Sequence, residues 1–274
     1  LYSTIRLLGF ALGPLVGGVI ASVGGPSAAF YASAILLGVS IVLVGWLVPD
    51  PREGPVQRSR RGPRPPVPWM FRFLGMSTFL MMVGISAIIS LFPAYQEEFG
   101  ATEAQLGLVF SAFIGTRCLL QYASGAIGDR FDKKRLLLAA LAAFVPLVAL
   151  QGFVTSLLQL TLIRIGLGAV SAAISASVGG IAAERSQPGN RARVMGINTL
   201  SFSLGVAIGP LLTGFIDDRR IAFALPAVAA LVWIGVLSIA VPGDRAHALR
   251  TQSENAGNAA SAPDAASPQS TSPA

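Results

Sequence analysis

The chain has 274 residues, of which 53% are hydrophobic and only 12% are charged, and its formal net charge is +7. Soluble domains carry about a quarter charged residues, so this composition excludes an ordinary water-soluble domain and indicates that lipid solvates much of the chain. The basic residues lie between apolar blocks, which argues against a nucleic-acid partner. Cys118 is the single cysteine, so an intrachain disulfide is excluded and neither a metal site nor a cofactor is indicated.

Long apolar blocks follow one another along the chain from its first residues. A helix needs about 20 mostly apolar residues to cross a bilayer. We therefore expect an all-α integral membrane protein, a helical bundle with about eight transmembrane helices. The expected spans are 4–24, 28–48, 70–93, 105–128, 135–154, 157–182, 194–216 and 220–241.

Two segments do not have the composition of membrane spans. Residues 49–69 are rich in proline and arginine, which predicts an extended linker. Residues 243–274 are rich in alanine, serine, proline and asparagine without an apolar period, which predicts a disordered tail.

The loops between the expected spans alternate in charge. Fifteen of the 20 lysines and arginines lie in the linker and the next helix start, in the loops near 130–135 and 185–193, and in the tail. The loops between them carry no lysine or arginine, except the turn 217–220, which has two of each charge. Positive loops face the cytoplasm, so we expect a multi-pass protein of the cell (inner or plasma) membrane with a cytoplasmic linker and tail.

A twelve-residue segment near the start recurs 196 residues later. Residues 9–20 (GFALGPLVGGVI) and 205–216 (GVAIGPLLTGFI) are identical at seven positions. In the first copy, Gly9, Gly13 and Gly17 are spaced by one helical turn, and such a stripe of small residues lets a second helix approach closely. Pro14 removes one backbone donor and bends the helix. A repeat at this offset is typical of transporters built from two six-helix halves.

Three motifs together resemble the major facilitator superfamily over residues 1 to about 242. The first resembles the antiporter motif of the fifth span and consists of Gly9, Gly13, Pro14, Gly17 and Gly18. The second resembles the helix–loop–helix gating motif, here between spans eight and nine, and consists of Gly125, Asp129, Arg130, Lys133, Lys134 and Arg135. The third consists of Arg164, Gly166 and Gly168, followed by Pro188, Arg191, Arg193 and Gly196.

The resemblance implies an N-terminally truncated 12-span carrier, of which this chain would contain spans five to twelve. Residues 1–48 would be the last two helices of the N-terminal half and 70–242 the complete C-terminal half. A fragment lacking spans one to four is not expected to transport alone. The antiporter motif implies export in exchange for protons. The gating motif implies that Asp129 latches the two halves, facing Ser3 and Thr4 at the start of the fifth span.

The gating motif also allows a simpler interpretation. Asp132 stands where the family usually has glycine, so the turn could differ in shape. Lys133, Lys134 and Arg135 would then be plain positive-inside anchors.

Two arginines, Arg117 and Arg164, lie deep within the expected spans. A charge at that depth costs about 2.5–3.5 kcal/mol on insertion scales and usually faces a cavity or a partner. Arg117, with Gln121 one turn away, is expected to line the transport cavity, or alternatively to form a structural bridge or snorkel outward. Arg164 matches an arginine that the family associates with proton coupling, although in the other half. Polar residues that could contact substrate or simply bond within the bundle are Ser77, Ser86, Tyr95, Asn198 and Ser201.

We therefore expect a secondary transporter that moves small molecules by alternating access, with a bias toward proton-coupled efflux of amphipathic compounds. No Asp, Glu or His lies in the middle of a span, so an acid for proton coupling is expected in spans one to four. The alternatives are an uptake carrier for sugars or organic acids and a non-transporting fragment. An enzyme is not expected, since neither a catalytic cluster nor a nucleotide-binding motif is present. The expected partners are a small-molecule substrate, protons and the bilayer, and no oligomer is required.

Overall fold

The computed structural model describes residues 2–47, 66–187, 189–216 and 218–241, without the side chains of 2–11, 14, 129 and 130. Within these ranges the protein is helical and contains no strand, which confirms the predicted all-α class. The predicted tail and most of the predicted linker lie outside the described residues. The elements are α1 (Tyr2–Leu47), α2 (Met70–Ser86), the 3₁₀ segment η1 (Ala87–Leu91), α3 (Phe92–Phe99), α4 (Glu103–Arg130), α5 (Lys133–Leu150), the 3₁₀ segment η2 (Gln151–Phe153), α6 (Leu157–Arg185), α7 (Arg191–Gly214) and α8 (Arg219–Ala240).

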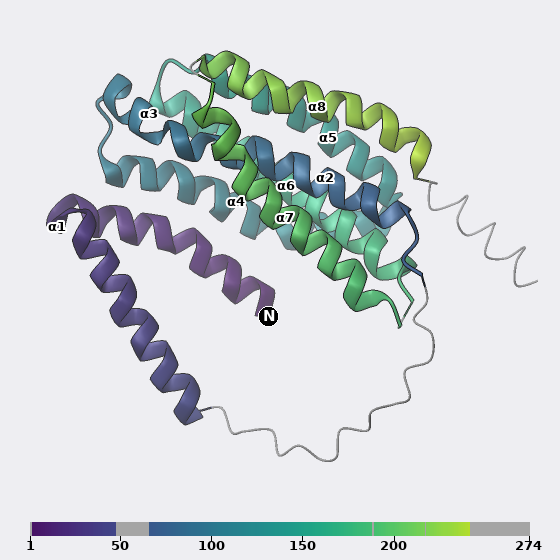
Figure 1. The fold of residues 1–274 in the computed structure, drawn as a ribbon, viewed down its shortest axis with the longest axis horizontal. Coiled ribbons are helices and arrows are strands. Elements are labelled where there is room, and N and C mark those ends of the chain that lie inside the picture. The colour runs from purple at the N-terminus through teal and green to yellow at the C-terminus, as the bar shows by residue number, and fades with distance from the viewer. Residues whose placement is uncertain (1, 48–65, 188, 217, 242–274) are drawn as a thin grey trace, which may run out of the picture.

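Seven helices of the described part are long and apolar enough to cross a membrane. The first of them lies within α1, which bends sharply at Gly25 (Figure 1). Gly25 has a φ of 76°, a conformation that glycine adopts without the steric cost of a Cβ atom. The two spans predicted at 4–24 and 28–48 are therefore the two arms of one bent helix.

The span predicted at 70–93 extends to Phe99 and is broken into α2, η1 and α3. Pro93 lies at the start of α3, where it has no N–H to continue the hydrogen bonds of the preceding helix. Gly100 then ends α3 in the left-handed conformation, with a φ of 59°. This break places a short helix at the end of the span, and α3 forms one wall of a pocket described below.

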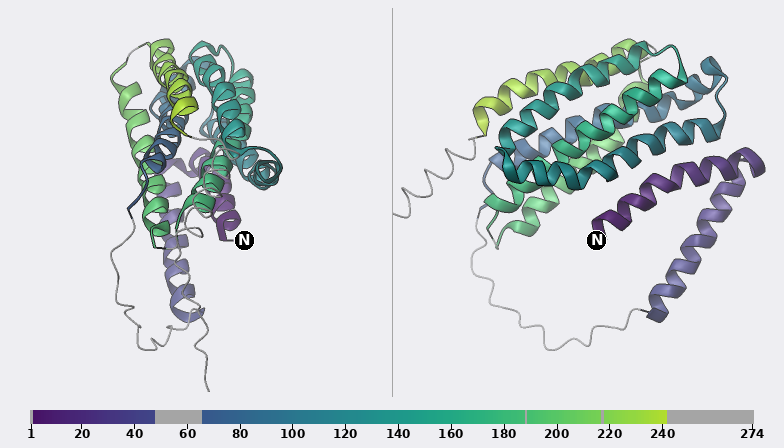
Figure 2. Two further views of the ribbon diagram at one scale, coloured as in Figure 1. Left: turned by 90° about the vertical axis from the view of Figure 1, so that its right-hand side faces the viewer. Right: turned by 180° about the vertical axis from the view of Figure 1, so that it is seen from behind.

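Helices α2 to α8 form one bundle with α6 near its centre (Figures 1 and 2). Helix α6 packs against α4, α5 and α2, and α2 packs against α7 and α8. The core consists of fully buried apolar side chains such as Leu137, Phe144, Leu160, Leu167, Ile174 and Phe223. Many large apolar side chains remain exposed on the outer faces, as expected for helices solvated by lipid.

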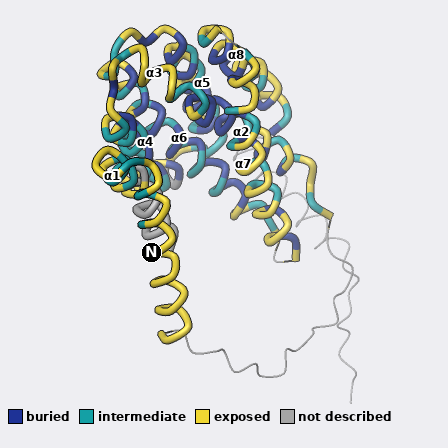
Figure 3. The backbone as a smooth tube through the Cα atoms, turned by 60° about the vertical axis from the view of Figure 1, so that its left-hand side comes forward, coloured by how far each residue is buried: buried dark blue, intermediate teal, exposed yellow. Residues whose placement is uncertain are grey.

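Helix α1 contacts this bundle through its first arm only. That arm lies along α4, whereas the second arm diverges from the bundle (Figures 1 and 2). No residue from 26 to 47 is buried, as Figure 3 shows.

Hydrogen bonds near the termini of the helices define two ends of the bundle. At one end, Lys134 Nζ donates to the carbonyl oxygen of Ser238 at 2.6 Å, and Asn190 Nδ2 donates to that of Pro66 at 3.2 Å. We call this the basic end, because the loops near 130–135 and 185–193 lie there. At the opposite end, the Tyr95 hydroxyl donates to the carbonyl oxygen of Gln151 at 3.1 Å. The alternation of basic loops along the sequence thus becomes a difference between two ends.

Candidate transport site

Arg117 lies at a close contact between α4 and α6. A Cβ atom on Gly168 of α6 would lie 2.5 Å from the carbonyl oxygen of Phe113 and 2.9 Å from Thr116 Cβ, so only glycine fits there. Arg117 is half-buried beside this crossing, and its Nη2 donates to Ser175 Oγ at 2.9 Å. The structure therefore places Arg117 between α4 and α6.

Arg164 of α6 is fully buried and lies beside the junction between α2 and η1, where the span from Met70 to Phe99 is broken. Its Nη1 and Nη2 both donate to the carbonyl oxygen of Ile85 at 3.1 Å, and its guanidinium lies 5.7 Å from the ring centroid of Phe113. Ile85 is in the last turn of α2, where carbonyl groups lack partners within the helix. Arg164 thus satisfies a backbone group that the end of α2 exposes.

The second copy of the glycine–proline repeat holds α7 against the same break. A Cβ atom on Gly205 or Gly209 would lie 2.6 Å from the carbonyl oxygens of Phe79 and Val83, respectively, so both glycines allow α7 to touch the backbone of α2. Thr213 Oγ1, one turn further on, donates to the carbonyl oxygen of Ala87 at 2.8 Å.

The first copy of the repeat packs differently. A Cβ atom on Gly18 would lie 2.9 Å from the carbonyl oxygen of Glu103, at the start of α4. Positions 13 and 17 have no neighbouring atom within 4 Å of a built Cβ. The side chains at positions 9 and 14 lie outside the described residues. Within the described part, the motif therefore meets α4 through Gly18.

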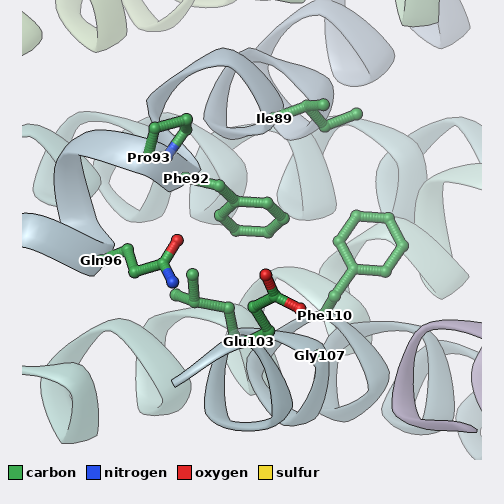
Figure 4. Close-up of a pocket in the computed structure, with 8 residues that line it drawn as sticks. Ile89, Phe92, Pro93, Gln96, Glu103, Gly107 and Phe110 are labelled. Carbon is green, nitrogen blue, oxygen red and sulfur yellow. The ribbon is translucent and has the colours of Figure 1, made fainter. Parts of the chain in front are cut away.

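A pocket of about 430 Å³ opens between α3 and α4 at the opposite end from the basic loops. Its walls are apolar except for the Gln96 amide and the Glu103 carboxylate, which lie near each other in Figure 4. The lining residues are Ile89, Phe92, Pro93, Gln96, Glu103, Leu106, Gly107 and Phe110.

The gating motif lies at the basic end and links three helices. Lys133 Nζ forms an ion pair with Glu184 of α6 at 2.7 Å, while Lys134 reaches the end of α8. Asp132 caps α5, since its Oδ1 accepts a hydrogen bond from the backbone N–H of Arg135 at 3.0 Å. The aspartate that departs from the family pattern therefore has a local structural role.

Other residues of the gating motif are less constrained by the structure. Gly125 has no atom within 4 Å of a built Cβ. The side chains of Asp129 and Arg130, and of Ser3 and Thr4, lie outside the described residues, and so does the predicted latch between them.

Comparison with known families decides the class of protein. The sequence profile of the Major Facilitator Superfamily matches residues 1–75 and 74–271. The chain belongs to the Major Facilitator Superfamily. It is therefore a helical membrane protein of a transporter family.

Three curated relatives illustrate the range of this superfamily. An uncharacterised MFS-type transporter of Methanocaldococcus jannaschii is 27% identical over 52% of this chain and 37% of its own length. The multidrug resistance protein MdtG of Enterobacter lignolyticus is 24% identical over 84% of this chain and 58% of its own length. The hexuronate transporter of Bacillus subtilis is 29% identical over 57% of this chain and 39% of its own length. The chain thus spans between 37% and 58% of the length of these relatives.

The structure brings only some of the predicted residues of this superfamily member together. Arg164 lies over the ring of Phe113, and the backbone nitrogen of Arg117 lies at the same contact between α4 and α6, beside Gly168. Gln121 is half-buried further along α4. No group of His, Cys, Asp and Glu side chains that could hold a metal ion is found among the described residues.

The predicted substrate-contacting polar residues bond within the bundle. Trp233 Nε1 donates to Ser77 Oγ at 2.9 Å, and Ser86 Oγ donates to the carbonyl oxygen of Gly205 at 3.1 Å. Tyr95 is buried, and its hydroxyl donates to the carbonyl oxygen of Gln151. Asn198 Oδ1 accepts a hydrogen bond from the Thr78 hydroxyl at 2.7 Å. The hydroxyl of Ser201 lies 2.7 Å from a Cβ built on Gly75.

Sequence reasoning missed the pocket between α3 and α4. Glu103 and Gln96 lie in or beside a predicted loop that has no basic residue and matches none of the three motifs. A signal was present, since a carboxylate directly after a helix-capping threonine predicts a fixed acid in the first helical turn.

Proposed function

We propose that the protein is a secondary active transporter that exports amphipathic small molecules in exchange for protons by alternating access. The observation that carries this proposal is the different packing of the two glycine–proline copies. The copy in α7 contacts α2 inside the bundle through Gly205 and Gly209, whereas the copy in α1 meets α4 through Gly18. The contact between α1 and α4 thus joins α1 to the bundle of α2 to α8, and a close backbone contact between two such bodies allows them to move relative to each other.

The similarity to MdtG, whose name refers to multidrug resistance, supports export. The proposal includes two bodies, with residues 1–48 belonging to one half of the transporter and 70–242 to the other. The linker and tail face the cytoplasm in this proposal, because the basic end carries the positive loops.

The second candidate function is uptake of small organic anions. The hexuronate transporter of B. subtilis is a relative, and the spans carry arginines at positions 117 and 164 without an acid at mid-depth. An anionic substrate would suit such a charge distribution.

Transport into proteoliposomes distinguishes these functions. The protein, expressed from its complete reading frame, is reconstituted and supplied with rhodamine 6G or radiolabelled glucuronate, each with and without an imposed pH gradient. Proton-coupled export predicts that vesicles accumulate rhodamine 6G only when the gradient drives exchange. Gradient-dependent accumulation of glucuronate alone would favour uptake, and accumulation of rhodamine 6G that ignores the gradient would contradict proton coupling.

Substitution of Gly18 tests the contact between α1 and α4. Gly18→Ala is expected to slow transport by about threefold to tenfold, because the new methyl group would lie 2.9 Å from a backbone oxygen of α4 and the two helices must separate. The measurement is the initial rate of transport in proteoliposomes, with thermal unfolding as a check that the bundle stays folded.

Gly17→Ala is the matched control, since nothing lies within 4 Å of a Cβ at that position. Its transport rate is expected to stay near that of the unchanged protein. An equal loss from both substitutions would show that the contact at Gly18 is not what the rate depends on.

A further inference from the structure

The pocket between α3 and α4 has the dimensions and walls of a small-molecule site. Its volume of about 430 Å³ lies within the range of about 300–1,000 Å³ that is usual for ligand pockets. It opens at the end of the bundle opposite the basic loops, and both of its walls belong to described helices of this chain (Figure 4).

Two aromatic rings form part of the wall. Phe92 of α3 and Phe110 of α4 contact each other edge to face, with ring centroids 6.2 Å apart and planes at 75°. Both are only partly buried. Such rings contribute apolar area and can attract a cation to their faces.

The pocket has one charged side chain, the Glu103 carboxylate, and its lining contains no Lys, Arg or His. Glu103 is half-buried and forms no ion pair within the described part of the chain. It is not used for capping either, because Gln105 completes the capping box with Thr102.

The basic residues at this end are engaged elsewhere. Arg219 forms an ion pair with Glu98 and lies over the ring of Tyr95, and Arg220 lies over the ring of Phe153. The pocket therefore combines apolar walls, aromatic rings and a carboxylate that has no ion-pair partner among the described residues.

We propose that this pocket binds an organic cation bearing aromatic or alkyl groups, with Glu103 as the counter-charge and Phe92 and Phe110 as the apolar contacts. Gln96 supplies the one other polar group, which can accept or donate a hydrogen bond to the ligand. The proposal deepens the exporter proposed above and rests on it for the pocket's role as a site at the outer mouth of the pathway. Binding itself needs only α3, α4 and η1.

Binding of two ions of the same shape and opposite charge tests the proposal. The 274-residue chain is placed in phosphatidylcholine nanodiscs, and binding of radiolabelled tetraphenylphosphonium and tetraphenylborate is measured by equilibrium dialysis, with empty nanodiscs subtracted. The expected result is saturable binding of the cation at least about tenfold tighter than that of the anion, with Glu103→Gln weakening cation binding about fivefold. Phe110→Leu is expected to weaken binding of the cation as well.

Glu97→Gln is the matched control, since Glu97 is exposed on α3 and does not line the pocket. Its cation affinity is expected to be unchanged. Equal affinity for the two ions, equal losses from Glu97→Gln and Glu103→Gln, or absence of saturable cation binding would each overturn the proposal. These outcomes are separate from the proteoliposome result. If the pocket binds the cation but the protein does not export, only the proposed function is contradicted.

Discussion

Gly168→Ala is expected to lower the free energy of unfolding by about 1–3 kcal/mol, the usual cost of overpacking a close contact. The added Cβ atom would lie 2.5 Å from the carbonyl oxygen of Phe113 and 2.9 Å from Thr116 Cβ. The backbone oxygen cannot rotate away as a side chain can, so α4 and α6 must separate. Because Arg117 on α4 donates to Ser175 on α6, the same separation is expected to weaken that hydrogen bond.

The measurement is equilibrium unfolding in mixed micelles, with helical content followed by circular dichroism. Gly179→Ala on the same helix is the control, because nothing lies within 4 Å of a Cβ at that position. Replacing a helical glycine by alanine favours the helix by up to about 1 kcal/mol, so the control is expected to be neutral or stabilising. Destabilisation of similar size in both variants would mean that the close contact at Gly168 is not the cause of the loss.

The positions of the helices could be predicted from the sequence because the length of an apolar block reports the length of a span. The break in the span that begins at Met70 could not. Residues 70–91 are mostly apolar. The hydropathy of a segment does not show whether it forms an α-helix or a 3₁₀ turn, whether the segment faces lipid or a packed core. Pro93, in the first turn of α3, was only a weak local signal. Pro146, Pro210 and Pro226 lie inside continuous helices, so a proline by itself does not mark a break.

Which glycines pack closely was also beyond the sequence. The repeat predicts that its glycines permit a helix contact, and Gly205 and Gly209 make that contact with α2. Gly17 and Gly18 are adjacent residues of one type, yet only Gly18 faces α4. The rotation of a helix about its axis is set by its tertiary partners, and a stripe of small residues does not specify them.

The pocket escaped prediction for a related reason. Glu103 and Phe92 belong to different helices, and they lie near each other only because the break in the span redirects α3 toward α4. The lining residues at 89–96 and at 103–110 each have the spacing of one helix face. Nothing in the sequence indicates that these two faces lie opposite each other.

Arg164→Ala is expected to lower the free energy of unfolding by about 2–4 kcal/mol. The substitution removes a fully buried side chain and leaves a cavity between α2, α4 and α6. It also leaves the Ile85 carbonyl without the two donors that now satisfy it, and a buried unpaired carbonyl costs about 1–3 kcal/mol. Burial of the guanidinium costs desolvation free energy, and its Nε has no hydrogen-bond partner. The substitution removes this cost, which offsets part of the loss.

Arg164→Met separates the two contributions, since methionine refills much of the volume without donating a hydrogen bond. Its unfolding free energy is expected to fall less than that of Arg164→Ala. In both variants, amide hydrogen exchange in η1 and the adjoining turn of α2 is expected to rise, because Arg164 no longer holds the junction.

Arg117→Ala provides the comparison with a half-buried arginine on α4. It is expected to leave exchange in η1 unchanged, because Arg117 donates to Ser175 and not to the broken span. If Arg164→Met left exchange at the junction at its original rate, the hydrogen bonds to Ile85 would not be what fixes the break. If Arg117→Ala raised exchange there equally, the effect would belong to general loosening of the bundle.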